Sequence, residues 1–298
     1  MKKTILFLLI CFPSLGCDIC GCANNNSFFG LMPASNRKFI GLRYRQQSYD
    51  SHVGSSYLAS KEDFLTTEIW TRFYPLEKLQ VVGYIPYNFH YQHSPSGEYA
   101  TEGIGDPSFL FQYNIINTLL DSTVHTINQN FLIGGGIKLP FGKFRYDESN
   151  PSEVANANFQ LGTGSTDFSF NLTYGLRYNY WGVNLDGQYK LNTKNPMNYQ
   201  FGNRISGGAT LFYTYGKGHK VTLMPYTNLY TEKSFYDSQS GLSNHSTGGT
   251  ISLWGIGTEF YFKKFMWGFN YQIPIDQNIA NHQINAKNRI SAHVSWLF

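Results

Sequence analysis

The stretch Lys287–Phe298 reads KNRISAHVSWLF, and it alternates between apolar and polar residues over most of its length. The apolar residues stand at every second position, namely Ile290, Ala292, Val294, Trp296 and Phe298. Polar residues separate them until Leu297, which breaks the alternation. Because successive side chains of a β-strand point to opposite faces, the pattern predicts a strand with one apolar and one polar face.

An alternating strand that ends on an aromatic residue resembles the terminal strand of outer-membrane β-barrel proteins. The alternative is an edge strand of a soluble β-sandwich. In the barrel interpretation the apolar face contacts lipid, and no edge of the sheet is left unpaired. We therefore expect Lys287–Phe298 to pair with a first strand near Lys38–Tyr49.

A two-residue period predicts about twelve strands along the whole chain. Their expected ranges are Lys38–Tyr49, Asp63–Tyr74, Leu79–Tyr91, Asp106–Asn117, Ile127–Pro140, Ser165–Asn179, Trp181–Leu191, Asn203–Tyr215, His219–Tyr230, Thr250–Phe262, Phe265–Ile275 and Lys287–Phe298. After the first strand the expected connections alternate between long and short. The long ones are Asp50–Glu62, Gln92–Gly105, Phe141–Gly164, Asn192–Gly202, Thr231–Gly249 and Asp276–Ala286.

This alternation of connections favours a membrane barrel over a sandwich. Outer-membrane barrels have short periplasmic turns and long external loops, with both chain ends on the periplasmic side. A sandwich has no physical reason to keep every long loop at one end. We expect an all-β fold, a transmembrane antiparallel up-and-down β-barrel of about twelve strands.

The first part of the chain predicts export. Met1–Gly16 has a basic start at Lys2 and Lys3, a short apolar run and small residues before Cys17, as in a signal peptide. The expected organisation is a signal peptide at 1–16, a periplasmic cysteine-containing segment at 17–37 and the barrel at 38–298. Within the second segment, Phe28–Met32 is apolar, and we expect it to pack at the periplasmic mouth as a partial plug.

Composition is compatible with a barrel and excludes other classes. Aromatic residues make up 17% of the chain and charged residues only 14%, and 29 residues are glycine. The net charge of +4 is spread along the chain without a basic block, so we expect no nucleic acid partner. The sequence has no nucleophile elbow, zinc-protease motif or phosphate-binding loop, so we expect no enzyme activity and no catalytic residue.

Three cysteines stand close together at the start of the expected mature chain, namely Cys17, Cys20 and Cys22. Thiolates in this spacing suit a soft metal ion, copper or zinc. Two of them could instead form a disulfide or a redox pair in the oxidising periplasm. Lipidation of Cys17 is the third interpretation, because the preceding residues partly match a lipobox.

Three glycine-rich stretches occur in a fixed order: Gly103–Asp106, Gly134–Gly142 and Gly162–Asp167. In this order and spacing they resemble the outer-membrane transporters catalogued under the meta-pathway of phenol degradation. The resemblance extends over roughly Ile40 to Phe298. It implies an outer-membrane barrel with a channel role. The cysteine segment lies outside that general pattern and is similar to the N-termini of Bacteroidetes-type barrels.

Charged residues on the parity opposite to the apolar rows are candidates for the lining of the lumen. They are Arg43, Arg45, Glu68, Arg72, Asp106, Lys138, Asp167, Arg177, Asp186, Lys190, Arg204 and Glu259. Since both signs occur, one interpretation is structural ion pairing across a polar lumen. The other is a selectivity lining, and the two are compatible if the pairs surround a constriction. Five histidines, among them His90, fall in or near the expected long connections, where histidine is common.

The leading functional hypothesis is an outer-membrane channel for small solutes, including hydrophobic or aromatic ones. The alternative is a non-conducting barrel that anchors a periplasmic cysteine-rich segment for metal binding or redox chemistry. The partners expected are outer-membrane lipid, a small-molecule solute and the barrel assembly machinery, which would bind the C-terminal strand. The expected location is the outer membrane of a Gram-negative bacterium, with both termini periplasmic.

Overall fold

The computed structural model describes residues 37–55, 58–118, 126–145, 157–216 and 220–298. The regular elements of these residues are all β-strands: β1 (Phe39–Ser51), β2 (Ser60–Leu76), β3 (Leu79–Ser94), β4 (Gly97–Ile104), β5 (Ser108–Asn117), β6 (Ile127–Lys138), β7 (Asp167–Tyr178), β8 (Trp181–Leu191), β9 (Tyr199–Gln200), β10 (Arg204–Tyr213), β11 (Val221–Ser234), β12 (Asp237–Gln239), β13 (Leu242–Asn244), β14 (Gly249–Phe262), β15 (Phe265–Ile279) and β16 (Ile284–Leu297). Among the described residues, no helix is long and apolar enough to cross a membrane.

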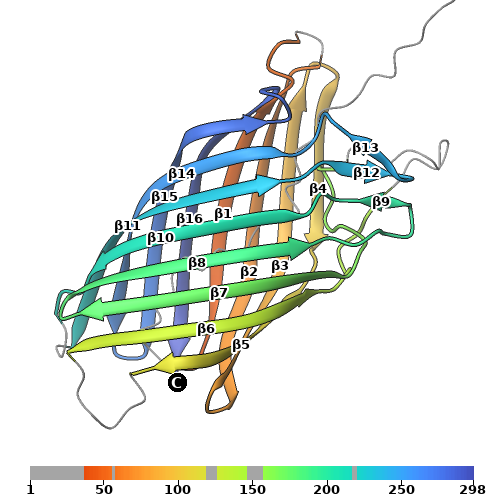
Figure 1. Cartoon of the computed structure of the whole chain (residues 1–298). Coiled ribbons are helices and arrows are strands. Elements are labelled where there is room, and N and C mark those ends of the chain that lie inside the picture. Colours follow the sequence, from red (N-terminus) through yellow and green to blue (C-terminus); the bar gives the residue numbers. More distant parts are fainter. Residues whose placement is uncertain (1–36, 56–57, 119–125, 146–156, 217–219) are drawn as a thin grey trace, which may run out of the picture.

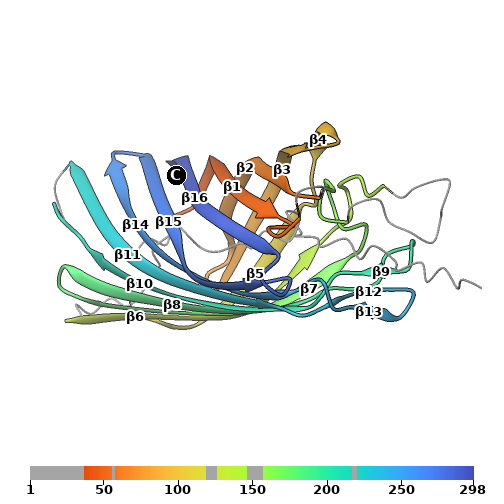
Figure 2. The same ribbon diagram turned by 90° about the horizontal axis from the view of Figure 1, so that it is seen from above.

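Twelve of these strands form a closed antiparallel barrel (Figures 1 and 2). Around the barrel the order is β1, β16, β15, β14, β11, β10, β8, β7, β6, β5, β3 and β2, and β2 then pairs with β1. The seam joins the two ends of the chain, since Phe39 is the register partner of Leu297. The predicted fold class and the predicted pairing of first and last strands are both confirmed.

The barrel has two distinct ends. The start of β1 and the end of β16 lie at one end, which we call the terminal end. The small strands β9, β12 and β13 lie at the opposite end, which we call the loop end (Figure 1). They form a separate three-stranded sheet inside connections that the sequence predicted to be irregular loops, Asn192–Gly202 and Thr231–Gly249.

Asp237 organises this small sheet at the loop end. Its carboxylate accepts hydrogen bonds from the Tyr199 hydroxyl at 2.6 Å and from the Gly202 amide at 2.7 Å. Burial raises the pKa of Asp237, and the hydrogen bonds from Tyr199 and Gly202 oppose that effect. Side-chain contacts of this kind leave little two-residue periodicity in the sequence, which is why the small strands were not predicted.

One strand of the wall is interrupted. Both β4 and β5 pair with β3, because Ile104 is the register partner of Tyr87 and Ser108 is the partner of Tyr84. Gly105–Pro107 separate the two halves, and a proline cannot donate a hydrogen bond to the ladder. The predicted loop Gln92–Gly105 is therefore wrong: this part of the chain is a hairpin in which β3 continues into β4.

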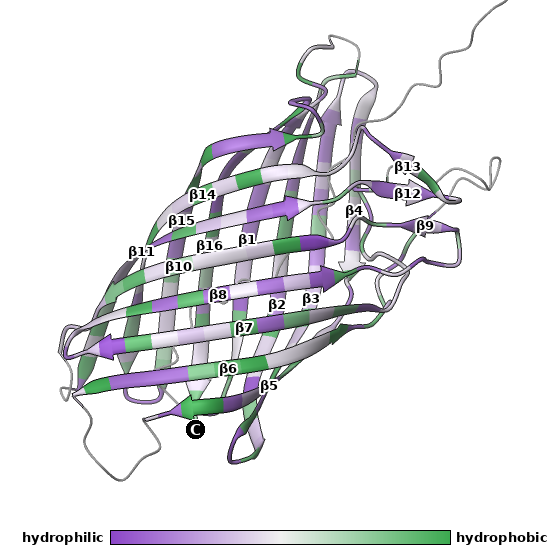
Figure 3. Ribbon diagram, viewed as in Figure 1, coloured by the Kyte–Doolittle hydropathy of each residue, from purple (hydrophilic) through white to green (hydrophobic). Residues whose placement is uncertain are grey.

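Hydrophobic and hydrophilic residues are interspersed along the wall strands (Figure 3), and their exposure differs between the two faces as the alternation predicts. Large apolar side chains on the outer face are exposed, for example Phe111 at 45%, Phe170 at 48% and Trp296 at 45%. Neighbouring residues on the inner face are buried and polar, for example Gln112 and Asn171. The barrel therefore presents an apolar exterior around a largely polar interior.

Leu297, which interrupts the alternation in sequence, obeys the strand geometry. Its side chain points inward and is buried in an apolar cluster that we call the terminal-end collar. The collar consists of Phe39, Trp70, Val82, Tyr84, Leu110, Met266 and Leu297. The interior is therefore apolar at this end of the barrel.

Candidate functional site in the barrel interior

The predicted lining residues occupy the inner face of the barrel, and several of them meet in two groups. Those that are buried are Arg43, Glu68, Arg72, Lys138, Asp167 and Glu259. The others are partly exposed, namely Arg45, Asp106, Arg177, Asp186, Lys190 and Arg204. Their role as a selectivity lining stays a prediction, whereas their ion pairs can be described directly.

The first group joins β1 and β2. Arg43 and Glu68 are register partners on these neighbouring strands, and their side chains form a buried ion pair. Arg45 contacts the second oxygen of the same carboxylate, with 3.1 Å between Nη2 and Oε2. The Arg43 guanidinium also stacks over the rings of Trp70 and Tyr84, at 5.0 and 5.1 Å from the ring centroids. The pair therefore fixes the side chains of the terminal-end collar.

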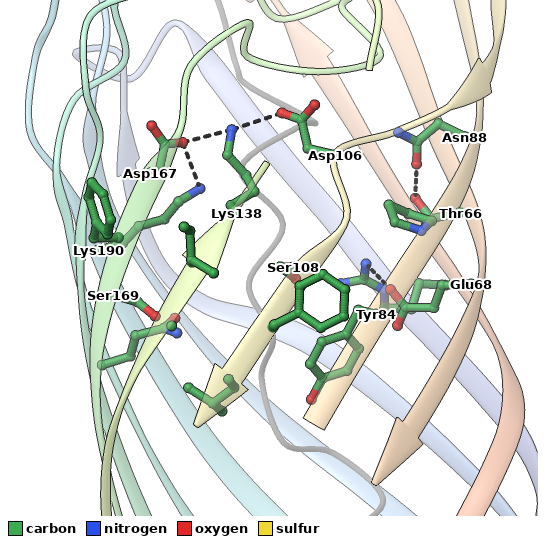
Figure 4. A pocket seen from close by; sticks show the side chains of 18 of the residues that line it. Thr66, Glu68, Tyr84, Asn88, Asp106, Ser108, Lys138, Asp167, Ser169 and Lys190 are labelled. Carbon is green, nitrogen blue, oxygen red and sulfur yellow. Dashed lines mark hydrogen bonds and ion pairs between the residues drawn. The ribbon is translucent and has the colours of Figure 1, made fainter. Parts of the chain in front are cut away.

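The second group joins β5, β6, β7 and β8 (Figure 4). The Lys138 ammonium lies 2.8 Å from an Asp106 oxygen and 2.7 Å from an Asp167 oxygen. Lys190 approaches the same Asp167 oxygen at 3.8 Å. Lys138 and Asp167 are register partners, whereas Asp106 reaches the group from the break between β4 and β5.

Asp106 uses that position to hold the connection between β6 and β7. Its carboxylate accepts hydrogen bonds from the Gly142 amide and the Thr163 amide, each at 2.8 Å, and from the Thr163 hydroxyl at 3.2 Å. Gly142 and Gly162 pack so closely that a Cβ on either would lie 2.7 Å from the Cα of the other. Only glycine permits this approach, so the two ends of the β6–β7 connection lie side by side at Asp106.

Residues 157–163, which we call the lumenal segment, lead from this anchor into the barrel interior. The Asn88 side-chain amide donates to the Leu161 carbonyl at 3.1 Å, which ties the segment to β3. The ring of Phe159 lies 6.4 Å from that of Phe64 and 6.1 Å from that of His90. Ala157 packs at the loop end against Tyr199 and Phe201, near β9. The sequence predicted this whole connection to be an external loop, and the described part of it folds inward.

An apolar cluster surrounds the interior at the loop end, and Phe159 packs against it. This loop-end collar consists of Tyr49, Phe64, Tyr230, Ile251, Leu253, Ala280, Ile284 and Ala286. The alternation places five of these side chains on the inward parity, namely Tyr49, Phe64, Tyr230, Ile251 and Leu253. Ile284 and Ala286 stand on the outward parity of the row that ends on Trp296 and Phe298, and they are buried because the register shifts between β1 and β16. Parity alone could therefore not have found these two.

His90 is a second residue whose role the sequence did not indicate. It lies on β3, within the predicted strand Leu79–Tyr91, with its side chain inward and 1% exposed. Among the described residues, neither ring nitrogen has a hydrogen-bond partner, although both are buried. An unsatisfied buried polar group costs about 1–3 kcal/mol, so such an atom calls for an explanation.

The remaining candidates are distributed along the barrel. Arg204 pairs with Glu232 at 2.9 Å, and Glu259 contacts His293 at 3.1 Å. The Arg72 guanidinium lies over the Phe39 ring and donates to the Arg37 carbonyl. Within the described ranges, Arg177 and Asp186 take part in no ion pair.

A cavity of about 70 Å³ opens between the two ionic groups (Figure 4). Residues of both signs line it, among them Arg45, Glu68, Asp106, Lys138, Asp167 and Lys190. The cavity also has neutral polar walls, for example Asn88 and Gln188. The interior therefore offers space for a small solute without a strong excess of either charge.

Several predictions concern residues outside the described ranges. The signal peptide, the plug residues Phe28–Met32 and the cysteines Cys17, Cys20 and Cys22 all lie there. In the part of the chain that the structure describes, no group of three or more His, Cys, Asp or Glu residues is arranged to hold a metal ion. The metal, disulfide and lipid interpretations of the cysteines remain predictions.

Comparison with known proteins identifies similar folds. No family model matches the chain, and no curated protein matches it. The structure is similar to that of an outer membrane channel from Pseudomonas putida F1, with a TM-score of 0.60 and 13% identity, over 92% of this chain and 100% of that one. It is also similar to the β domain of the Bordetella autotransporter BrkA, with a TM-score of 0.54 and 10% identity, over 88% of this chain and 100% of that one. At these identities the likeness concerns the fold alone.

Proposed function

We propose that the protein is an outer-membrane channel for small solutes, hydrophobic or aromatic ones included. The observation that carries the proposal is the contrast between the two faces of one closed barrel. Exposed side chains such as Phe111 and Phe170 form an exterior suited to lipid, whereas the interior holds a polar cavity between the two ionic groups. A closed barrel leaves no unpaired strand edge, which is the requirement for a sheet in a bilayer.

The interior favours uncharged solutes in particular. The acidic side chains that line the cavity, Glu68, Asp106 and Asp167, are all paired with lysine or arginine. The two collars add inward aromatic and aliphatic side chains at both ends of the path. An apolar solute that carries few charges would find contacts here that a salt ion would not.

The test is conductance and uptake by the purified full-length protein. We expect discrete current steps in planar bilayers and swelling of liposomes in small neutral solutes. A correctly folded protein that gives neither would refute the channel. Binding of copper or zinc by such a protein, lost in a variant with Cys17, Cys20 and Cys22 changed to Ser, would support the alternative of a non-conducting anchor.

Sidedness follows from the same proposal. We propose that the loop end faces the cell exterior and that both termini are periplasmic, with β16 bound by the barrel assembly machinery during insertion. An epitope inserted after Gly241, in the hairpin between β12 and β13, should be detected on intact cells. The matched insertion between Lys263 and Lys264, at the terminal end, should stay hidden until the cells are permeabilised. The reverse result would invert the orientation.

A further inference from the structure

The lumenal segment lies against the inner face of the barrel near the loop end. Phe159 lies against Phe64 on β2 and His90 on β3, whereas Ala157 lies against Tyr199 and Phe201, in the connection that carries β9. The segment therefore packs between the inner face of β2 and β3 and the small sheet at the loop end.

The position of the segment is fixed at one side of Phe159. Leu161 and Thr163 are bound through their carbonyls, by Asn88 at 3.1 Å and by Asn195 at 3.0 Å. Asp106 accepts the Thr163 amide at 2.8 Å. These bonds hold the backbone, and the Phe159 ring extends from that backbone toward the loop-end collar. The ring can therefore change rotamer without breaking any of them.

The wall beneath the Phe159 ring is chemically unusual. Phe64 and His90 make an edge contact with ring centroids 4.8 Å apart, and Phe159 covers both. In the part of the chain that the structure describes, the two buried nitrogens of His90 have no hydrogen-bond partner. A neutral imidazole offers one donor and one acceptor, so this wall has an aromatic surface and an unused hydrogen-bonding edge. The ring of Phe159 packs against the aromatic surface, but it has no donor or acceptor for the nitrogens of His90.

We infer that the place of the Phe159 ring, between Phe64 and His90, is a solute-binding site, and that an entering solute displaces this ring. The ligand class is a small apolar ring with one hydrogen-bonding group: the ring replaces that of Phe159, and the group pairs with His90. The inference rests on the proposed channel function and makes Phe159 the residue that determines which solutes pass.

The test measures binding to the purified full-length protein by ligand-observed NMR, with benzyl alcohol and toluene as probes. The two probes share a ring and differ in one hydroxyl. The wild type should bind benzyl alcohol several-fold more tightly than toluene. Phe159→Ala should strengthen the binding of both by roughly tenfold or more, because the competing ring is gone. Phe170→Ala, a matched truncation on the outer face, should change neither affinity.

His90 has its own pair of variants. His90→Phe should bind the two probes about equally, and His90→Gln, which keeps a donor and an acceptor, should restore the preference for the alcohol. Unchanged binding in Phe159→Ala, or a preference that persists in His90→Phe, would overturn the inference. The heat-dependent shift in gel mobility shows whether each variant is folded. Conductance is measured separately. A protein that binds the probes but does not conduct would refute the channel function and support the binding site. A protein that conducts but does not bind the probes would refute the binding site alone.

Discussion

Replacing Asp106 by Ala should release the lumenal segment while leaving the barrel intact. The carboxylate accepts three hydrogen bonds from Gly142 and Thr163 and forms one ion pair with Lys138. Lys138 keeps its second partner, Asp167, after the substitution. The loss therefore falls on the connection between β6 and β7, and the strand ladder keeps all of its own hydrogen bonds.

The size of the effect follows from these contacts. A neutral hydrogen bond contributes about 0.5–1.5 kcal/mol and one to a charged group about 1.5–3 kcal/mol. Asp106 is almost fully buried, with 6% of its side chain exposed, so solvent screens the contacts little. We estimate that about 3–6 kcal/mol of local stability is lost, because water can replace some of the lost hydrogen bonds. Since each 1.4 kcal/mol is a factor of ten, the released state should become at least about a hundred times more populated.

The assay uses a cysteine at position 157. Ala157 is 3% exposed, so Ala157→Cys should react slowly with a membrane-impermeant maleimide. The background carries Ser at Cys17, Cys20 and Cys22. In that background, adding Asp106→Ala should raise the labelling rate at least tenfold and increase the current noise in planar bilayers. Asp106→Asn, which keeps one acceptor oxygen, should give an intermediate rate.

The control is Asp186→Ala. Asp186 lies on the inner face of β8 without an ion pair in the described part of the chain, and it makes no contact with the lumenal segment that the structure records. Equal labelling rates in the parent, Asp106→Ala and Asp186→Ala would refute the assignment of Asp106 as the anchor. A loss of barrel assembly in Asp106→Ala alone would also refute it, because the role argued here is local.

Three further predictions test the barrel itself. Phe111→Arg should make the free energy of insertion about 2–4 kcal/mol less favourable if the residue lies near the bilayer midplane. Ser169→Arg, at the wall of the interior cavity, should assemble normally. Equal amounts of both variants in the membrane fraction would contradict the assignment of Phe111 to the lipid face and Ser169 to the interior. Leu42 and Val294 are register partners across the seam, so the double variant Leu42→Cys/Val294→Cys should form a disulfide that preserves fast gel migration after heating. Failure of the two cysteines to cross-link would contradict the closure of the barrel by β1 and β16. Glu68→Leu should lower stability by about 3–5 kcal/mol, measured by the denaturant midpoint of folding into detergent, because the buried Arg43 loses its partner and the partly exposed Arg45 does too.

The wall strands could be predicted because their chemistry is local. A strand in a barrel wall has one face toward lipid and one toward the interior, so its side chains alternate whatever the rest of the chain does. The row that ends on Trp296 and Phe298 is exposed in the structure, as the alternation predicts. The seam could also be predicted, since closing the sheet requires the first and last strands to meet.

The course of the β6–β7 connection could not be predicted, because it depends on contacts between distant residues. Asp106 and Thr163 are 57 positions apart, and Asn88 and Leu161 are 73 positions apart. No periodicity marks such pairs. The glycines at 142 and 162 were noticed as parts of a resemblance, whereas their physical role, a close contact of two backbones, needs the folded chain.

The ionic groups of the interior act on structure more directly than on selectivity. Arg43 and Glu68 face each other across adjacent strands, and Lys138 and Asp167 do the same, so each pair neutralises itself within the wall. Paired charges project a weak field into the barrel interior, so under the proposed channel function we expect size and apolar contact to distinguish solutes. Asp106 also uses its remaining lone pairs to place the segment that carries Phe159. In this barrel a charged residue therefore holds the lumenal segment in position, and the rings of Phe64 and His90 pack against it.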